Sequence, residues 1–485
     1  MTSARKASAG APKVLIVASE GMPFVKTGGL ADVIGALPGA LIALGVDARV
    51  MMPKHARIKR KYQDELETVA TTSVHLGWRQ KYLGVETMVL DGVIYYFIDN
   101  EDYFGSDVYR GGDAENEQYL YFCKAVCEAL SIIDFDPDVL HLNDWHTGMV
   151  PLLMKTQYAG QSGKEKSLLF TIHNIEFQGK MDFGFMSDLL GIPGCYNTPE
   201  FVEANGCANM MKAALVFADR ISTVSPTYAN EIMYSWFGLG MEGILSARRH
   251  EMDGILNGID AKAYDPENDP YIEARFSAGD LRAKRTNKRA LRDEFSLDID
   301  LSTPIISMVS RMTRQKGFDL VTYALEELLQ EDAAFVILGS GDQKYQDFFN
   351  YIAAKYPGRS GVFIGYNEPL AHRVYAGSDF FLMPSEFEPC GLSQMISQRY
   401  GTLPIVRETG GLVDTVAPYN IFTGEGTGFA FSTFNAHDMM ASIRLALSVY
   451  KDKPVLRRLR KNAMLVDNGF SKSAEQYKAL YKSMA

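Results

Sequence analysis

The chain has 485 residues, of which 47% are hydrophobic and 22% are charged, and its 49 basic and 59 acidic side chains give a formal net charge of −10. This composition excludes disordered, collagenous and disulfide-scaffold proteins, and the length allows roughly two to four domains with cores of their own. The negative charge argues against a general nucleic-acid-binding protein, which needs a basic face. Any anionic ligand must therefore be held by a local cluster of positive groups.

Neither membrane insertion nor secretion is predicted. Apolar runs such as 34–46 are interrupted by Gly and Pro and fall short of the roughly 20 residues that a membrane span needs. The leader, residues 1–12, is small, polar and basic and lacks the apolar core of a secretory signal, so we expect a flexible arm. The five cysteines form no C-x-x-C pair, which favours reduced thiols in a cytoplasmic protein. A disulfide framework is the alternative.

Short β-branched runs alternate with amphipathic stretches, a pattern typical of parallel sheets covered by helices on both faces. In the first half, strands are predicted over 13–18, 47–52, 85–90, 93–98, 138–143 and 168–172, and helices over 30–44, 117–133 and 147–158. The stretch 254–270, rich in Gly, Asn, Asp and Pro, interrupts this pattern. We place the domain boundary there.

A second alternating series follows the boundary. It predicts strands over 304–310, 334–339, 380–384 and 403–406, and helices over 319–330, 343–355 and 437–450. The chain is therefore expected to be an α/β protein with two doubly wound domains joined by a hinge. Ligands should bind in the cleft, because open parallel sheets bind ligands beyond the carboxyl ends of their strands.

Two loops between a strand and a helix carry cations suited to phosphate. Lys26-Thr27-Gly28-Gly29-Leu30 follows the first strand, and its adjacent glycines let the backbone approach a ligand where the next helix begins. An ordinary glycine-rich turn fits that spacing equally well. In Ser310–Gly317 (SRMTRQKG), Arg311 and Lys316 could stabilise the charge that develops on a departing diphosphate. The alternative is a solvated turn, and we expect Arg314 to face water.

Glu386 and Glu388 lie in one loop, Ser385–Leu392, after a predicted strand. A retaining glycosidase needs two carboxylates about 5–5.5 Å apart across the scissile bond, and neighbours at i and i+2 cannot easily flank a substrate in this way. We therefore expect Glu388 to hydrogen-bond sugar hydroxyls and Glu386 to be a solvated charge. Gly339-Ser340-Gly341 begins like a dinucleotide fingerprint, but Lys344 stands where the third glycine belongs, so a nicotinamide site is disfavoured.

Histidines and polar groups gather at two further strand ends, His141–His146 and Thr171–Asn174. A His/Asp/His zinc site is conceivable, but His141 lies inside a strand and is expected to point into the core, which disfavours a metal. Polar side chains beside Trp145 suit a carbohydrate, which offers hydroxyls to bond and C–H faces to stack. Asn257 lies in a segment that either faces the cleft or forms a plain turn.

Taken in order, these motifs resemble the signature of bacterial glycogen synthases and plant starch synthases. The matching segments are 26–33 (KTGGLADV), 143–146 (NDWH), 171–174 (TIHN), 256–260 (LNGID), Ser310-Arg311 with Lys316-Gly317, 388–392 (EPCGL) and 409–412 (TGGL). The resemblance implies two Rossmann-like domains facing a deep cleft, the glycosyltransferase-B arrangement. The acceptor-side domain would span 13–260, the nucleotide-sugar domain 261–460, and a C-terminal helix over 461–485 would cross back to the first domain.

The resemblance also implies an activity and a set of site residues. The activity is retaining transfer of glucose from ADP-glucose to the non-reducing end of an α-1,4-glucan such as glycogen, without a metal or other cofactor. Five residues are implied as catalytic. Glu388 would hold the donor glucose, and Arg311 and Lys316 would bind the diphosphate. His173 and Asp144 would lie near the transferred glucose and the incoming hydroxyl. The implied donor contacts are Lys26, Gly28, Gly29, Asn257, Tyr366 stacked on the adenine, Leu392, Ser393, Thr409, Gly410 and Gly411, and the acceptor side would include Asn174, Trp145 and Tyr103.

One position departs from many glycosyltransferases of this fold, which carry a second glutamate eight positions after the first. Here that position is Ile396, as in the bacterial synthases. Because no residue is an evident covalent nucleophile, we favour departure and attack on the same face of the sugar, with cations stabilising the leaving diphosphate. Two alternatives stay open: an enzyme like the longer, pyridoxal-phosphate-dependent glycogen phosphorylases, and a non-catalytic glucan-binding scaffold.

Overall fold

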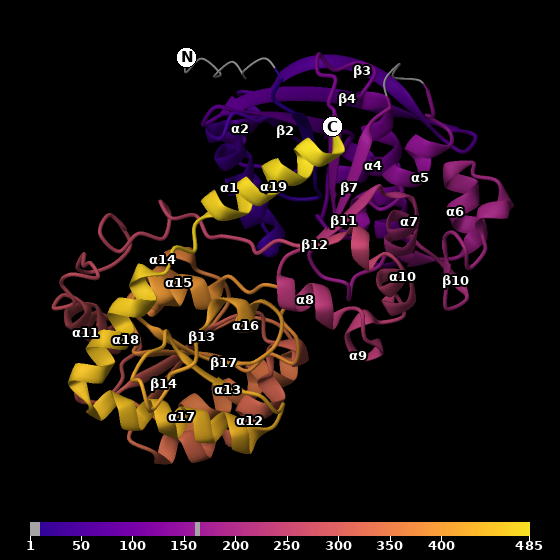
Figure 1. The fold of residues 1–485 in the computed structure, drawn as a ribbon. Coiled ribbons are helices and arrows are strands. Elements are labelled where there is room, and N and C mark those ends of the chain that lie inside the picture. The colour runs from indigo at the N-terminus through magenta and orange to yellow at the C-terminus, as the bar shows by residue number, and fades with distance from the viewer. Residues whose placement is uncertain (1–9, 161–164) are drawn as a thin grey trace. The chain divides into compact units, whose positions relative to one another are not determined.

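The computed structural model describes residues 10–160 and 165–485 and divides into two compact units. Unit 1 comprises the chain up to Gly258 together with Phe470–Ala485, and unit 2 comprises Ile259–Gly469 (Figure 1). The division falls inside the 254–270 stretch that interrupts the sequence pattern. Residues 1–9 of the predicted flexible leader lie outside the described part of the chain.

Unit 1 contains a nine-stranded sheet in the order β12-β11-β7-β6-β1-β2-β5-β4-β3 among the described residues. Its strands are β1 (Lys13–Val17), β2 (Asp47–Pro53), β3 (Glu67–Leu76), β4 (Arg79–Leu90), β5 (Val93–Asp99), β6 (Val139–Asn143), β7 (Ser167–Ile172), β11 (Arg220–Thr223) and β12 (Met252–Gly254). A small second sheet consists of β8 (Lys180–Met181), β9 (Glu203–Ala204) and β10 (Cys207–Asn209). All pairings from β12 to β5 are parallel, as the alternating pattern predicts.

The edge of this sheet departs from the predicted parallel arrangement, because β3, β4 and β5 pair antiparallel. Asp91 and Gly92 connect β4 to β5, and their φ angles of 50° and 83° are both positive. An Asp-Gly pair is well suited to a two-residue hairpin turn, since that turn requires positive φ at both of its central residues. This dipeptide is therefore the local reason for the antiparallel edge.

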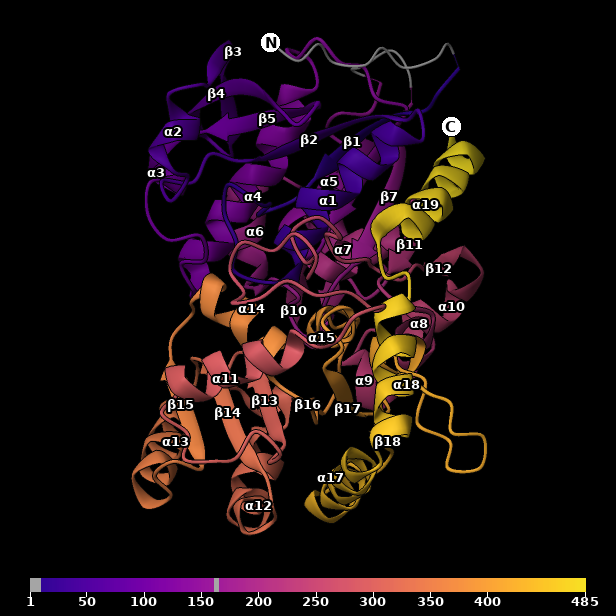
Figure 2. The same cartoon turned by 90° about the vertical axis from the view of Figure 1, so that its left-hand side faces the viewer.

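The helices of unit 1 cover the sheet and include the C-terminal end of the chain. They are α1 (Gly29–Ala43), α2 (Arg60–Gln63), α3 (Glu101–Phe104), α4 (Gly112–Ala129), α5 (Val150–Lys155), α6 (Phe183–Leu190), α7 (Met210–Phe217), α8 (Pro226–Glu231), α9 (Ser235–Gly238), α10 (Glu242–Ala247) and α19 (Phe470–Met484). Figures 1 and 2 show α19 lying beside α1. The predicted C-terminal helix over 461–485 is divided in the structure, because residues 461–465 complete α18 (Lys453–Leu465) in unit 2 and α19 begins at Phe470.

A buried polar chain joins α19 to the sheet of unit 1. The hydroxyl of Tyr481 lies 2.8 Å from His141 Nδ1, and His141 Nε2 lies 2.6 Å from the hydroxyl of Thr171. His141 is 1% exposed, which confirms the prediction that it points into the core. These contacts fix the end of the chain against the strands that carry the candidate site.

Unit 2 contains a parallel sheet in the order β15-β14-β13-β16-β17-β18 (Figure 2). Its strands are β13 (Ile305–Val309), β14 (Ala334–Gly339), β15 (Ser360–Ile364), β16 (Phe380–Met383), β17 (Leu403–Arg407) and β18 (Phe429–Phe431). Its helices are α11 (Lys284–Glu294), α12 (Phe318–Gln330), α13 (Gln343–Lys355), α14 (Glu368–Gly377), α15 (Ser393–Arg399), α16 (Gly411–Thr415), α17 (Ala436–Lys451) and α18 (Lys453–Leu465). Apolar side chains of α12, α13, α17 and α18 pack on the strands to form its core.

The two α/β units, with a mostly parallel sheet in unit 1 and a parallel sheet in unit 2, confirm the predicted fold class. Across the described residues, no helix combines the length and the apolar character needed to cross a membrane.

Candidate active site

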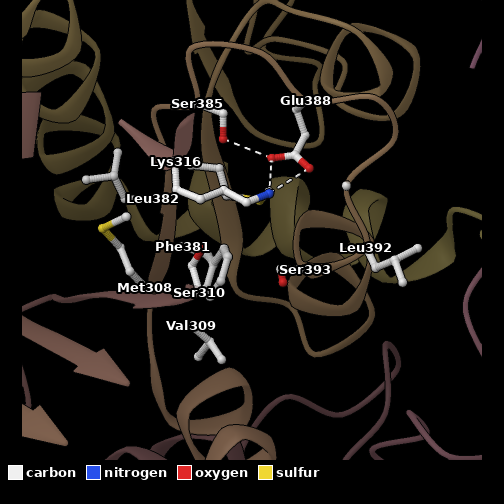
Figure 3. A pocket seen from close by; sticks show the side chains of 12 residues that line it. Met308, Val309, Ser310, Lys316, Phe381, Leu382, Ser385, Glu388, Leu392 and Ser393 are labelled. Atoms are coloured by element: carbon white, nitrogen blue, oxygen red, sulfur yellow. Dashed lines mark hydrogen bonds and ion pairs between the residues drawn. The ribbon is translucent and has the colours of Figure 1, made fainter. Parts of the chain in front are cut away.

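Lys316 and Glu388 form an ion pair beyond the carboxyl ends of β13 and β16, which are adjacent parallel strands. Lys316 Nζ lies 2.9 Å and 2.7 Å from the two carboxylate oxygens, and Ser385 Oγ donates to Glu388 Oε2 at 2.9 Å. Because Glu388 is only 5% exposed, these contacts replace most of the hydration that its charge has lost. Figure 3 shows the three side chains meeting at one pocket.

The pocket beside this ion pair has a volume of about 50 Å³. A cavity of this size holds a few water molecules, so within unit 2 it accommodates only a part of a larger ligand. Its lining includes Leu392 and Ser393, two of the predicted donor contacts, together with Met308, Val309, Ser310, Lys316, Phe381, Leu382, Met383, Ser385, Glu388 and Gly391.

The loop that carries Lys316 is tied to the loop of Glu388 by the main chain. Glu386 N–H donates to the carbonyl of Gln315 at 2.8 Å. Gly317, which ends this turn, has a φ of 75°, and a Cβ at this position would lie 2.0 Å from the carbonyl oxygen of Pro384. Only glycine avoids both the strained dihedral and the clash. Gly317 therefore lets the two loops approach closely enough for the ion pair to form.

The two arginines of the same segment differ in their surroundings. Arg311 is exposed, and its guanidinium forms no hydrogen bond or ion pair with any other described residue. Arg314 is 69% exposed and pairs with Glu386, which confirms that Arg314 faces water. The prediction of Glu386 as a solvated charge is wrong, because its side chain is 20% exposed and held by this pair.

Of the predicted donor contacts Thr409, Gly410 and Gly411, which follow β17, Gly411 lies against the loop of Glu388. Gly411 N–H donates to the carbonyls of Glu388 and Pro389 at 3.1 Å and 3.2 Å. A Cβ at Gly411 would lie 2.2 Å from the carbonyl oxygen of Cys390, so this contact requires glycine. Tyr366, the predicted adenine-stacking residue, lies between β15 and α14 with 64% of its surface exposed.

In unit 1, the predicted Lys26–Gly29 loop is held by a carboxylate that the sequence motifs did not reveal. Glu20, after β1, accepts hydrogen bonds from Thr27 N–H, from Thr27 Oγ1 at 2.7 Å and from Gly28 N–H at 3.2 Å. Glu20 is 2% exposed, and this burial raises its pKa to about 7. Lys26 itself pairs with Asp32 at 2.6 Å.

Asp144 occupies the equivalent place after β6. Its φ of 58° with ψ of 175° is a strained conformation for a residue with a side chain. Asp144 Oδ1 accepts hydrogen bonds from the main-chain N–H groups of His173 at 2.7 Å and Asn174 at 3.3 Å. Burial raises the pKa of this carboxyl to about 7. Asp144 thus fixes the turn that carries His173, and it does so through the backbone.

The protonation of His173 follows from its neighbour Asn143. The side-chain amide nitrogen of Asn143 donates to the carbonyls of Val17 and His141, both at 3.1 Å, so its oxygen must face His173 Nε2 at 2.9 Å. An amide oxygen only accepts, so Nε2 carries the proton. Burial lowers the pKa of His173 to about 3, which keeps the ring neutral near pH 7 and leaves Nδ1 without a proton.

The predicted acceptor-side aromatics are packed inside unit 1. Trp145 is 5% exposed, its ring lies 4.3 Å from that of His146, and a Cβ on Gly179 would meet it at 2.3 Å. Trp145 therefore has little open surface on which a sugar could stack. Tyr103 is 4% exposed, stacks on Tyr121 and donates its hydroxyl to a glutamate, so it too has little free surface.

The remaining predictions concern Asn257 and metal binding. Asn257 is 6% exposed, and its Oδ1 has no hydrogen-bond partner among the described residues. Within residues 10–160 and 165–485, no group of three or more His, Cys, Asp or Glu side chains could hold a metal ion.

In comparison with known proteins, each unit matches the model of a protein family. Residues 13–247 match the family model of the starch synthase catalytic domain, and residues 291–465 match that of glycosyl transferases group 1. With two α/β units and parallel sheets, these matches define a glycosyltransferase of the GT-B fold. Glycogen synthases from Geobacillus thermodenitrificans and Geobacillus stearothermophilus are each 51% identical over 473 residues, which is 97% of this chain and 98% of theirs. The chain therefore belongs to the bacterial glycogen synthase family.

More distant similarities extend to solved structures. The catalytic domain of starch synthase IV from Arabidopsis thaliana, bound to ADP and acarbose, superposes with a TM-score of 0.91 at 31% identity and covers 98% of this chain and 99% of that one. A sucrose-phosphate synthase from Thermosynechococcus elongatus has a TM-score of 0.63 at 16% identity and shares the fold alone.

Proposed function

We propose that this chain transfers glucose from ADP-glucose to the non-reducing end of an α-1,4-glucan such as glycogen, with retention of configuration. The observation that carries the proposal is the Lys316–Glu388 pair at the pocket of unit 2, with Arg311, whose guanidinium has no partner among the described residues, in the same segment. Membership in the glycogen synthase family supports the activity, and the ADP bound to the similar starch synthase IV supports the nucleotide.

The ion pair suits a site that must hold both a sugar and a phosphate. An ammonium group has three N–H donors, and Glu388 takes two of those of Lys316. The third is left for a phosphate oxygen, while the remaining lone pairs of Glu388 can accept from glucose hydroxyls. Arg311 adds a second cation whose planar guanidinium suits bidentate phosphate contacts.

In the proposed reaction, the bond between glucose C1 and the diphosphate oxygen breaks while the acceptor O4 forms its bond to C1 on the same face. The proton of the acceptor hydroxyl passes to the departing phosphate oxygen, so the substrates complete the acid–base step themselves. Lys316 and Arg311 stabilise the negative charge that grows on the diphosphate. The neutral His173, with its unprotonated Nδ1, offers the transferred glucose an acceptor for a hydroxyl.

The remaining roles follow the family resemblance. Asp144 and Asn174 would shape the turn of His173, and Asn257 would offer its unpartnered Oδ1 to the substrate. The residues assigned to donor binding are Lys26, Gly28, Gly29, Tyr366, Leu392, Ser393, Thr409, Gly410 and Gly411. We assign Trp145 and Tyr103 to support of the acceptor side, because both rings are covered. The five free cysteines support a reducing compartment, the cytoplasm.

The test is release of ADP from ADP-glucose and glycogen by the purified full chain. Wild type should release ADP, Lys316→Ala and Glu388→Ala should each lose nearly all of this activity, and Lys344→Ala should keep it. Lys344 is the matched control, because it is a 61% exposed lysine of unit 2 that also pairs with a carboxylate. UDP-glucose in parallel tests the nucleotide. A wild type that releases no ADP, or normal activity in both site variants, would contradict the proposal.

A further inference from the structure

Two buried carboxylates of unit 1 hold neighbouring loops by the same kind of contact. Glu20 accepts from the N–H groups of Thr27 and Gly28, and Asp144 accepts from those of His173 and Asn174. These acids follow β1 and β6, which are adjacent and parallel. Ligands bind at this edge of such sheets. Asp144 belongs to the proposed site, whereas Glu20 has had no role so far.

The contacts of Glu20 account for its burial. Oε2 accepts from both the N–H and the hydroxyl of Thr27, and Oε1 accepts from the N–H of Gly28. Gly28 is the N-cap of α1, and the first N–H groups of a helix have no acceptor within the helix. Glu20 thus supplies acceptor oxygens to the N–H groups just before α1, while the N–H of Gly29, the first residue of α1, has no acceptor within the helix.

We infer that Glu20 is a positioning residue, which holds the Lys26–Gly29 loop in the shape that binds the diphosphate of the donor. The inference rests on the donor-binding role that the proposed function gives to this loop, and it adds a residue outside every motif of the sequence. Lys26 is fixed separately by its pair with Asp32. Glu20 therefore controls the backbone of the loop, and Asp32 controls its cation.

A purely structural role for Glu20 makes a different prediction. If the side chain only fills space in the core, then Glu20→Gln, which has nearly the same size, should behave as wild type. If its oxygens position the loop, the amide nitrogen of Gln must face an N–H of Thr27 or Gly28, and two donors repel each other. The loop should then loosen although the volume of the side chain is unchanged.

The experiment measures the KM values for ADP-glucose and for glycogen in the full chain. Glu20→Gln should raise the KM for ADP-glucose about tenfold and leave the KM for glycogen within about twofold, because a misplaced loop weakens donor binding. Hydrogen exchange of the amides in residues 24–31 should be faster in this variant without any ligand. Glu128→Gln is the matched control and should leave both KM values unchanged. Glu128 is a half-buried glutamate of unit 1 that accepts a hydrogen bond from the hydroxyl of Tyr158 at 2.7 Å.

A second variant keeps the test decisive if Glu20→Gln does not fold. Thr27 is exposed, and Thr27→Val removes only the hydroxyl donor, so it should raise the KM for ADP-glucose about threefold. Combined with Glu20→Gln, it should add less than it does to wild type, because both changes weaken contacts of the same side chain with the same loop. Unchanged donor KM and unchanged amide exchange in both variants would overturn the role of Glu20 while the activity stands. A wild type that releases no ADP would overturn the proposed function instead.

Discussion

The candidate site residues of the two units lie at equivalent places but are held in opposite ways. Glu20 and Asp144 of unit 1 follow the adjacent parallel strands β1 and β6, and Lys316 and Glu388 of unit 2 follow the adjacent parallel strands β13 and β16. In unit 2 the carboxylate of Glu388 is bound by side chains, Lys316 and Ser385. In unit 1 the carboxylates of Glu20 and Asp144 are bound mainly by main-chain N–H groups.

This difference decides what each carboxylate can do. An ion pair at a pocket presents charge directly to a ligand, so removing either partner changes the chemistry of the site. A buried carboxylate without a cation is costly to ionise, which is why burial raises the pKa of both Glu20 and Asp144 to about 7. Such groups act by fixing the backbone. Substitutions in unit 2 should therefore alter turnover most, and those in unit 1 should alter loop geometry and pH behaviour.

The largest effect should come from separating the ion pair of unit 2. Lys316→Ala should lower kcat by about 10²–10³-fold, because it removes one preorganised donor to the leaving diphosphate. Glu388→Ala should cost a similar factor, and the double variant should be little worse than either single one, since the two residues act as a unit. The measurement is a double-mutant cycle on kcat. Additive losses would mean that the two side chains act independently.

Gly317→Ala should be the next most damaging change, although it removes no functional group. The new methyl group would meet the carbonyl of Pro384 at 2.0 Å, and the φ of 75° disfavours alanine. We expect a loss of about 2–4 kcal/mol in unfolding free energy and about 10²-fold in kcat, as Lys316 moves away from Glu388. Gly243→Ala, in open space within α10, is the control; it should leave activity unchanged and should not lower the unfolding free energy, since Ala favours a helix more than Gly does.

Arg311 and Arg314 together test whether a cation without an ion-pair partner among the described residues contributes more to donor binding than one held in an ion pair. Arg311→Ala should lower kcat/KM for ADP-glucose by about 10–10²-fold, which is the loss of one charge-assisted contact to phosphate. Arg314→Ala should stay within about twofold, because exposed ion pairs contribute little. Steady-state kinetics at low and high salt check both. Equal losses in the two variants would mean that the segment acts only through its overall charge.

The sequence predicted the fold well because most of it is set by local pattern. The strands β1, β13 and β14 and the helix that follows each of them, α1, α12 and α13, agree with the predicted ranges to within one or two residues, whereas α4 and α5 differ from theirs by three to five. The antiparallel edge at β3 to β5 was missed, although Asp91-Gly92 carried a readable turn signal. In unit 2 the four predicted strands correspond to β13, β14, β16 and β17, whereas β15 and β18 were not predicted.

The sequence motifs identified candidate site residues, but they did not predict which side chains contact one another. Lys316 and Glu388 are separated by 72 residues, so their pairing depends on the approach of two loops that no local pattern encodes. Glu20 stands alone between a strand and a loop, and a single buried acid has no motif. The burial of Trp145 depends on its neighbours in space, His146 and Gly179, which composition and spacing do not reveal.

The carboxylates of unit 1 should make its stability depend on pH. Asp144 has its pKa raised from 3.8 to about 7, so the folded state binds this proton more tightly than the unfolded state does. The unfolding free energy should therefore fall as pH rises from about 4 to about 7, by at most about 1.4 kcal/mol per pH unit. Asp144→Asn lacks this loss. Its melting temperature relative to wild type should rise between pH 5 and pH 7.5, and a constant difference would contradict the raised pKa.

The smallest effect should come from Ser385, which supports the ion pair from the side. Ser385→Ala removes the hydrogen bond of 2.9 Å to Glu388 Oε2 but leaves both contacts of Lys316 in place. A net hydrogen bond to a charged group contributes about 1.5–3 kcal/mol, and the remaining partner compensates part of it, so we expect roughly a fivefold loss in kcat. Ser385→Thr, which keeps the hydroxyl, should recover most of that loss. If Ser385→Ala were as inactive as Lys316→Ala, the carboxylate of Glu388 would depend on its whole set of partners, and the ion pair alone would not define the site of unit 2.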